Sequence, residues 1–111
     1  MERIVEKTVL YDFYGELLTK RQQEIFEAVV FNDMTLSEAA NEYGISRQGV
    51  SDLLRRSEET LLFYESHIHS IEQFEKLQSA ADELQSIAET LPQQEAEKLG
   101  KLGEKIRKII G

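Results

Sequence analysis

The sequence predicts an all-α protein: a helix-turn-helix bundle with a long helix and a C-terminal helical hairpin. Apolar side chains recur every three or four positions, which is the period of an amphipathic helix rather than of a strand. The 111 residues include one proline, Pro92, so long stretches are free to be helical. Hydrophobic residues at 41% and charged residues at 31% are typical of an ordered globular chain.

The first two helices are expected over residues 2–18 and 20–31. The first carries a wide apolar face broken by acidic side chains; this face consists of Ile4, Val5, Val9, Tyr11, Phe13, Tyr14, Leu17 and Leu18. Thr19 and Gln22 have the spacing of a capping box, in which each side chain bonds a backbone amide at the start of a helix. The helix that follows is expected to bury Ile25, Phe26, Val29 and Val30.

A short third helix is expected from Leu36 to just before Gly44. Thr35 and Glu38 have the spacing of a second capping box, which places the start of this helix at Leu36. Glycine adopts the left-handed C-cap conformation most easily, so the helix should stop by Gly44.

A long fourth helix should follow, capped by Ser46 and running from Arg47 to at least His69 without a breaker. It is expected to bury Val50 and Leu53, then Leu61 or Leu62, together with Tyr64 and Ile68.

The two last helices, over residues 70–91 and 93–110, are separated by Pro92 and should form a hairpin. Their apolar residues alternate at intervals of three and four, the pattern of a packed seam. The expected seam residues are Phe74, Leu77, Ala81, Leu84, Ala88 and Leu91 on one helix and Leu99, Leu102, Ile106 and Ile109 on the other. Such a stripe is usually a core or an oligomer interface, so the tail should pack against the first helix, against a second copy of the chain, or both. We favour a homodimer.

We therefore divide the chain into a helix-turn-helix domain with its N-terminal helix, residues 1–60, and a helical tail that dimerises, residues 61–111.

Residues 35–56 have the pattern of a helix-turn-helix. Two helices that cross at a tight turn need small residues where they meet, which Ala39 and Ala40 supply, and a positive φ in the turn, which Gly44 supplies. Val50 is spaced to point back at the first helix of the motif.

If the helix from Arg47 lies in a major groove, its outward polar residues would face base edges and phosphates. These residues are Arg47, Gln48, Ser51, Asp52 and Arg55. Lys20 and Arg21 are further candidates for phosphate contacts. The net charge of −8 opposes nucleic-acid binding, and the alternative is a helix-turn-helix that serves as a protein–protein scaffold.

Enzymatic and metal chemistry are not expected. The chain has no cysteine, no glycine-rich phosphate loop and no nucleophile elbow. His67 and His69 are two positions apart, on nearly opposite sides of a helix, so they do not predict a metal site. We expect no cofactor and no catalytic residue. Without an export signal or an apolar run of about 20 residues, we expect a cytoplasmic protein without membrane insertion.

The segment LLTKRQQEIFEAVVFNDMTLSEAANEYGISRQGVSDLLRRSEETLLFYE, residues 17–65, resembles the YlxM family of small bacterial proteins. The first half of this family is similar to region four of sigma factors. In that likeness Arg47, Gln48, Ser51 and Arg55 match DNA-facing positions. This chain departs from a sigma factor by lacking every other sigma region and by its acidic charge.

The resemblance implies a non-catalytic regulatory or accessory role in the signal recognition particle pathway, because family members are typically encoded beside genes for that particle's protein or receptor. The partner would be the particle's protein, its RNA or duplex DNA. RNA duplex grooves do not admit a helix, so RNA binding should use Lys20, Arg21, Arg55 and Arg56 as phosphate contacts. Binding to the particle's protein should instead use an apolar surface of the tail. The alternative is a transcriptional regulator of its own operon that does not contact the particle.

Overall fold

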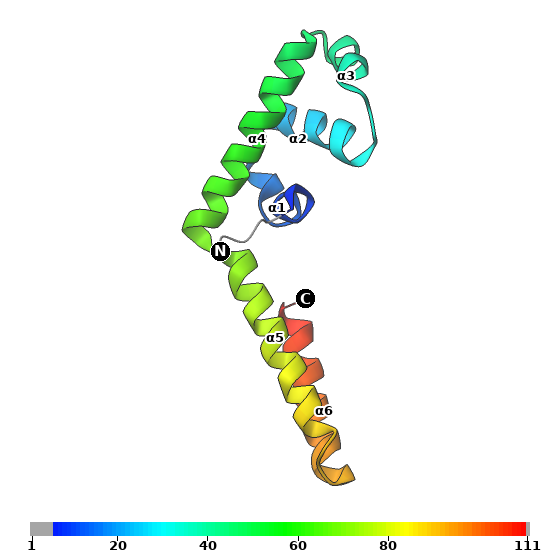
Figure 1. Cartoon of the computed structure of the whole chain (residues 1–111), viewed down its shortest axis with the longest axis vertical. Helices are drawn as coiled ribbons and strands as arrows, with labels where there is room; N and C mark the ends of the chain where they lie inside the picture. The colour runs from blue at the N-terminus through cyan, green and yellow to red at the C-terminus, as the bar shows by residue number, and fades with distance from the viewer. Residues whose placement is uncertain (1–5, 111) are drawn as a thin grey trace. The chain divides into compact units, whose positions relative to one another are not determined.

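The computed structural model describes residues 6–110, in which every regular element is helical, as predicted (Figure 1). The elements are α1 (Lys7–Tyr14), the 3-10 turn η1 (Gly15–Leu17), α2 (Lys20–Phe26), the π-helical turn η2 (Glu27–Phe31), α3 (Leu36–Tyr43), α4 (Arg47–Ile68), α5 (Ser70–Ala88) and α6 (Gln93–Ile110). The chain forms two compact units with their boundary between His69 and Ser70. The boundary lies after residue 60 because α4 continues unbroken to Ile68.

The N-terminal helix differs from the expectation in extent and in its buried face. The part expected over residues 2–5 lies outside the described residues. The helix changes to a 3-10 turn at Gly15, where an added Cβ would lie 2.9 Å from the Tyr11 ring. Leu10, which the apolar pattern did not select, is fully buried, whereas Leu17 is 54% exposed.

Tyr11 joins the N-terminal helix to the second helix. Its ring stacks on Phe26 with the ring centroids 4.6 Å apart and the planes 7° from parallel. Burial, together with the charge of Glu27 and a hydrogen bond to its carboxylate, raises the pKa of Tyr11 to about 12. The phenol therefore stays neutral at physiological pH.

The two predicted capping boxes are present. In each, the Thr hydroxyl accepts a hydrogen bond from the backbone amide three residues on, at 3.2 Å for Thr19 and 3.1 Å for Thr35. The side chains of Gln22 and Glu38 accept in return from the backbone amides of the two threonines. These reciprocal bonds satisfy amides that the first turn of a helix leaves unpaired.

The second helix was expected to continue regularly to residue 31, but it widens into the π-helical turn η2 after Phe26. Ile25 and Phe26 are buried as predicted. Val29 and Val30 are only half-buried and Phe31 is 44% exposed, because the wider turn rotates the last residues away from the positions that a regular α-helix would give them.

The helix-turn-helix has the local geometry that its sequence predicts. Gly44 adopts φ +66° and donates its backbone N–H to the Ala40 carbonyl. The Ser46 hydroxyl accepts from the Gly49 amide at 2.9 Å and caps α4. Ile25, Ala39 and Val50 are fully buried at the centre of the motif. Partly buried side chains surround them: Val29, Met34, Leu36, Ala40, Tyr43, Ile45, Leu53 and Leu54.

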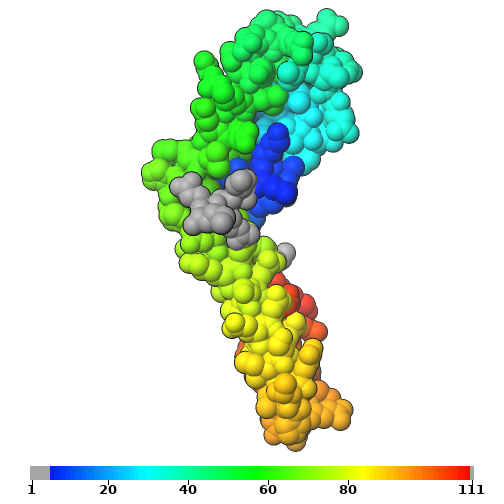
Figure 2. Space-filling model, in the orientation of Figure 1, coloured from blue at the N-terminus to red at the C-terminus, as the bar shows by residue number. Residues whose placement is uncertain are grey.

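The long α4 spans the whole first unit, with α2 and α3 lying against its N-terminal half (Figures 1 and 2). Farther along α4, Leu61 is fully buried while Leu62 is 45% exposed. The Tyr14 hydroxyl donates to the Glu65 carboxylate and ties α1 to α4. The helix ends at Ile68, which is exposed rather than buried as expected, and His69 takes a positive φ of 60°.

The second unit is the expected hairpin of α5 and α6, but part of the expected seam is wrong. Ala81, Ala88 and Gly103 are the buried residues between the two helices, whereas Leu77, Leu91, Leu102 and Ile109 are exposed. An added Cβ at Gly103 would lie 3.3 Å from Cγ of Gln85. Small residues let the two helix axes approach so closely that the leucines are displaced to one side of the contact.

Arg107 fixes α6 against α5 in this hairpin. Its guanidinium donates to the Gln85 side-chain oxygen at 2.9 Å and to the Asp82 carboxylate.

Candidate nucleic-acid interface

The first turns of α4 present three polar side chains to the outside. Arg47, Gln48 and Ser51 are exposed, and with Leu36 they line a shallow concavity at the surface of the helix-turn-helix. Val50, which alternates with them, is fully buried, and this burial sets the rotation of α4 about its axis. The three residues therefore lie where a recognition helix presents its base-reading groups.

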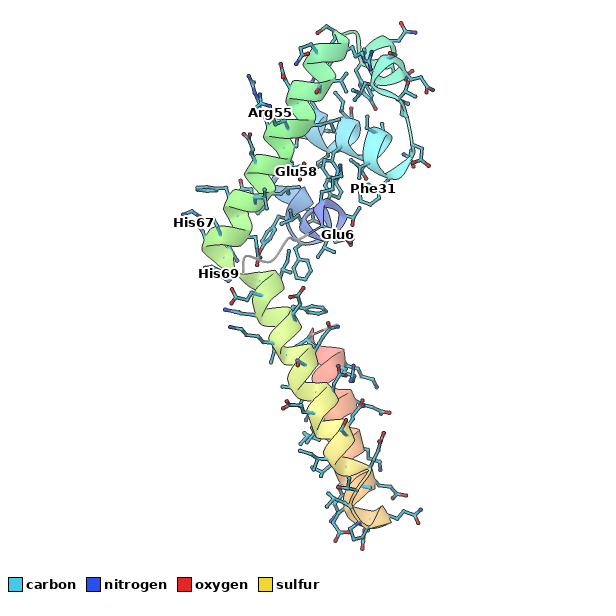
Figure 3. The ribbon with its side chains drawn as sticks, in the orientation of Figure 1. Glu6, Phe31, Arg55, Glu58, His67 and His69 are labelled. Carbon is cyan, nitrogen blue, oxygen red and sulfur yellow. The ribbon has the colours of Figure 1, made fainter. Side chains whose placement is uncertain are left out.

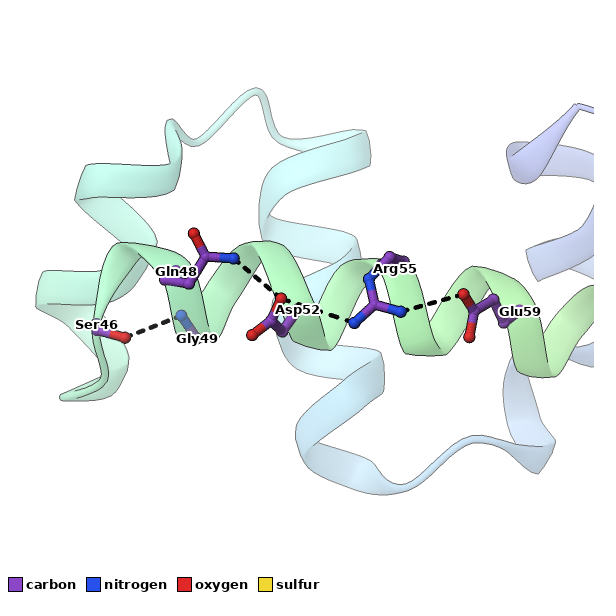
Figure 4. Close-up of polar contacts among 6 residues, drawn as sticks. All are labelled: Ser46, Gln48, Gly49, Asp52, Arg55 and Glu59. Carbon is purple, nitrogen blue, oxygen red and sulfur yellow. Dashed lines mark hydrogen bonds and ion pairs between the residues drawn. The ribbon is translucent and has the colours of Figure 1, made fainter.

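The outward face of α4 is linked by a chain of side-chain contacts (Figure 4). Gln48 Nε2 donates to Asp52 Oδ1 at 3.0 Å. Asp52 Oδ1 lies 3.7 Å from Arg55 Nη2, and Arg55 Nη1 lies 3.2 Å from Glu59 Oε1. A base or phosphate that engages Gln48 or Arg55 must therefore compete with these carboxylates.

That competition is weak. Arg55 has a side chain 58% exposed and points away from α2, on the open side of α4 (Figure 3). Exposed ion pairs at this spacing contribute only about 0.3 to 0.5 kcal/mol. Arg55 is therefore available to a phosphate, although Asp52 and Glu59 lower the positive potential around it. The spacing of three and four residues in Asp52, Arg55 and Glu59 is the signal in the sequence that predicts this pairing.

Two other predicted residues line a separate concavity between α2 and α4. Arg21 and Arg56 border it together with Asp52. Its remaining lining residues are Thr19, Gln22, Ile45, Gly49 and Leu53. Both arginines are exposed, so this concavity offers two cations beside one carboxylate.

Arg21 also has a structural contact that the sequence did not suggest. Its guanidinium donates to the Tyr43 carbonyl at 3.2 Å. Tyr43 is the last residue of α3, where carbonyl groups lack partners within the helix. Arg21 thus ties the start of α2 to the end of α3, while Lys20 beside it is exposed.

Apart from Asp52, whose negative charge opposes binding, the structure separates the predicted residues into three groups. Arg47, Gln48, Ser51 and Arg55 share the outward face of α4, Arg21 and Arg56 line the concavity beside α2, and Lys20 lies exposed at the start of α2. Their contact with nucleic acid stays a prediction.

No helix within residues 6–110 is long and apolar enough to cross a membrane. The same residues hold no group of three or more His, Cys, Asp or Glu side chains placed to bind a metal ion.

Comparison with known proteins gives consistent matches. A family model, UPF0122, described as "Putative helix-turn-helix protein, YlxM / p13 like", matches residues 1–102. The chain is 40% identical over 88 residues to a UPF0122 protein of Thermoanaerobacter sp. (strain X514), covering 79% of this chain and 75% of that protein. It is 41% identical over 85 residues to a UPF0122 protein of Symbiobacterium thermophilum, covering 77% and 79%. A UPF0122 protein of Latilactobacillus sakei is 41% identical over 76 residues, or 68% of this chain and 67% of that protein.

Proposed function

This chain belongs to the UPF0122 family of YlxM/p13-like helix-turn-helix proteins, and we propose that its helix-turn-helix binds nucleic acid in a non-catalytic regulatory role. We place this role in the signal recognition particle pathway, in the cytoplasm, with the protein acting as a homodimer. Duplex DNA is the nucleic acid that the geometry favours, because a major groove admits an α-helix whereas the narrow major groove of an RNA duplex does not.

The observation that carries the proposal is the exposed triad at the start of α4. Arg47, Gln48 and Ser51 face outward from a helix whose rotation is set by the buried Val50. Arginine pairs with guanine or phosphate, and glutamine pairs with adenine. Arg55, one turn farther along the same face, adds a phosphate contact that Asp52 and Glu59 weaken.

The charge of the chain sets the expected strength of binding. With a net charge of −8, the protein gains little from long-range attraction to phosphates. Binding should therefore depend on the few local cations, and the logarithm of the binding constant should fall with the logarithm of the salt concentration by only about 0.9 for each phosphate that they contact. Low overall affinity with a clear preference for one sequence is the expected behaviour of this face.

The place in the signal recognition particle pathway rests on the resemblance to the YlxM family, whose members are typically encoded beside genes of that particle. The alternative is a transcriptional regulator of its own operon without contact to the particle. Because both functions use the same helix-turn-helix, the two are separated by binding partners rather than by the fold.

Fluorescence anisotropy of labelled nucleic acids across a salt series tests the proposal. The probes are duplex DNA from upstream of the chain's own operon, a scrambled duplex, and signal recognition particle RNA with and without its protein. We expect preference for the operon duplex and loss of that preference in Arg47→Ala and Gln48→Ala. Lys101→Ala, an exposed α6 residue, is the control for the loss of a positive charge.

Equal binding by Arg47→Ala and the Lys101→Ala control would overturn the role of the α4 face. Binding to the particle or its RNA but to neither duplex would make the helix-turn-helix a scaffold and Lys20, Arg21, Arg55 and Arg56 the residues to test next. Binding to the operon duplex alone, with no binding to the particle, would support the alternative.

A further inference from the structure

We infer that the α5–α6 hairpin pairs with a second copy of this chain through one apolar face, with α5 of each copy lying on α6 of the other. The inference deepens the homodimer of the proposed function by assigning its surface and arrangement. It requires no nucleic acid, so its failure and the failure of nucleic-acid binding are measured separately.

Large apolar side chains stay exposed on both helices of the hairpin. On α5, Leu77 is 46% and Ile87 57% exposed. On α6, Leu102 is 48% and Ile109 76% exposed. Half-buried apolar residues adjoin them: Leu84, Leu99 and Ile106. A monomeric protein rarely leaves a contiguous apolar surface of this kind uncovered.

These residues lie on one side of the hairpin. On α5, Leu77 comes four positions before the buried Ala81, and on α6, Leu102 comes one position before the buried Gly103. At 3.6 residues per turn, Leu77 is rotated away from Ala81, and Leu102 away from Gly103, in the same direction about the axis of its own helix. A two-fold axis perpendicular to the plane of the hairpin relates its two antiparallel helices. Side chains rotated in the same direction on the two helices therefore lie on the same face of the hairpin. By the same count from Ala81 or Gly103, five further apolar residues lie on this face: Leu84, Ile87, Leu99, Ile106 and Ile109.

The outer edges of this face carry opposite charges on the two helices. Glu83 comes one position before Leu84 on α5, and Lys98 and Lys105 occupy the equivalent edge of α6. All three are exposed and have no hydrogen bond or ion pair within residues 6–110. Lys76, also on the α5 edge, lies seven positions before Glu83 and is in an exposed ion pair with Glu72 at 3.1 Å. Glu95, eight positions before Gly103, adds a negative charge on the same side of α6 near Pro92. Around Glu83 the α5 edge is thus negative, and at Lys98 and Lys105 the α6 edge is positive.

These charges select a second copy and its orientation. If the two-fold axis of the dimer is parallel to the helices, α5 lies on the partner's α6. Each residue then has the same position along the helix axis in both copies. Gly103 lies against Leu84 and Gln85 across the hairpin, so Glu83 is near the level of the partner's Lys105. A two-fold axis across the helices would lay α6 on α6 and bring the lysines of the two copies together, which is repulsive.

Sedimentation of the full chain over a concentration series tests the face. We expect the wild-type chain to dimerise and Leu102→Lys to weaken the dimer by about tenfold or more, because it places a charge in the apolar contact. Gln78→Lys is the matched control: it adds the same charge at an exposed α5 position three residues before Ala81, on the other side of the hairpin. Circular dichroism confirms that both variants keep their helices.

A wild-type chain that stays monomeric throughout the series would overturn the inference, as would equal dimerisation by Leu102→Lys and Gln78→Lys. A charge exchange then tests the arrangement. We expect Glu83→Lys and Lys105→Glu each to weaken the dimer and the double variant to restore it, with the differences fading at high salt. If the double variant dimerises no more tightly than the single variant with the weaker dimer, the arrangement of α5 on the partner's α6 is wrong.

Discussion

The Gln48 side-chain amide donates a hydrogen bond to the Asp52 carboxylate one turn along α4, with the two atoms 3.0 Å apart. The same carboxylate faces Arg55 at 3.7 Å. Asp52 thus orders two side chains of the outward face while placing a negative charge among them. Its effect on binding can be measured separately from its effect on order, because asparagine keeps a hydrogen-bond acceptor and loses the charge.

We predict that Asp52→Asn tightens binding to duplex DNA by about fivefold, since removing one charge near phosphates is worth about 1 kcal/mol in water. Anisotropy at fixed salt measures the change. Glu95→Gln, at an exposed position on α6, is the control for the gain in net charge. If both variants tighten binding equally, only the net charge matters and Asp52 has no local role.

The capping boxes predict a loss of stability when a threonine is replaced. Thr35→Ala removes the acceptor for the Glu38 amide and should lower the free energy of unfolding by about 1 kcal/mol. Thr35→Ser keeps the hydroxyl and should lower it by much less. Urea denaturation followed by circular dichroism checks both values, and equal losses would show that the methyl group rather than the hydroxyl matters.

Two glycine substitutions should change stability in opposite directions. Gly44→Ala should destabilise the first unit by about 1 kcal/mol, because its φ of +66° strains a residue with a Cβ. Gly100→Ala lies within α6, where an added Cβ has no atom within 4 Å, and should stabilise the hairpin by up to about 1 kcal/mol. Thermal unfolding curves compare the two, and a fall in the melting temperature for Gly100→Ala would contradict this prediction.

Tyr11 predicts a loss of stability in alkali. Its pKa is raised from 10.0 to about 12 in the folded protein, so the folded state favours the neutral phenol. The resulting stabilisation is complete below pH 10 and is lost as the pH rises from 10 to 12. Tyr11→Phe should reduce this fall in the free energy of unfolding and remove the last component of the phenolate absorbance titration. A titration curve that keeps this component would assign the raised pKa to another tyrosine.

Part of the candidate site could be predicted from the sequence, and part could not. The outward direction of Arg47, Gln48 and Ser51 follows from the period of the helix once Val50 is assigned to the core, and all three are exposed. The contact between Arg21 and the Tyr43 carbonyl joins residues 22 positions apart, and no local pattern encodes it. The same holds for the concavity that Arg21 and Arg56 share.

Local sequence sets where the helices of the motif begin and end. Thr19, Thr35, Ser46 and Gly44 act through bonds to residues three or four positions away, so a short stretch of sequence contains the whole interaction. In the hairpin, by contrast, the packing of the two helices against each other sets which apolar residues are buried. Periodicity marks a stripe on each helix of the hairpin, but the stripe is wider than the contact, and the close approach at Gly103 selects Ala81 and leaves Leu77 exposed.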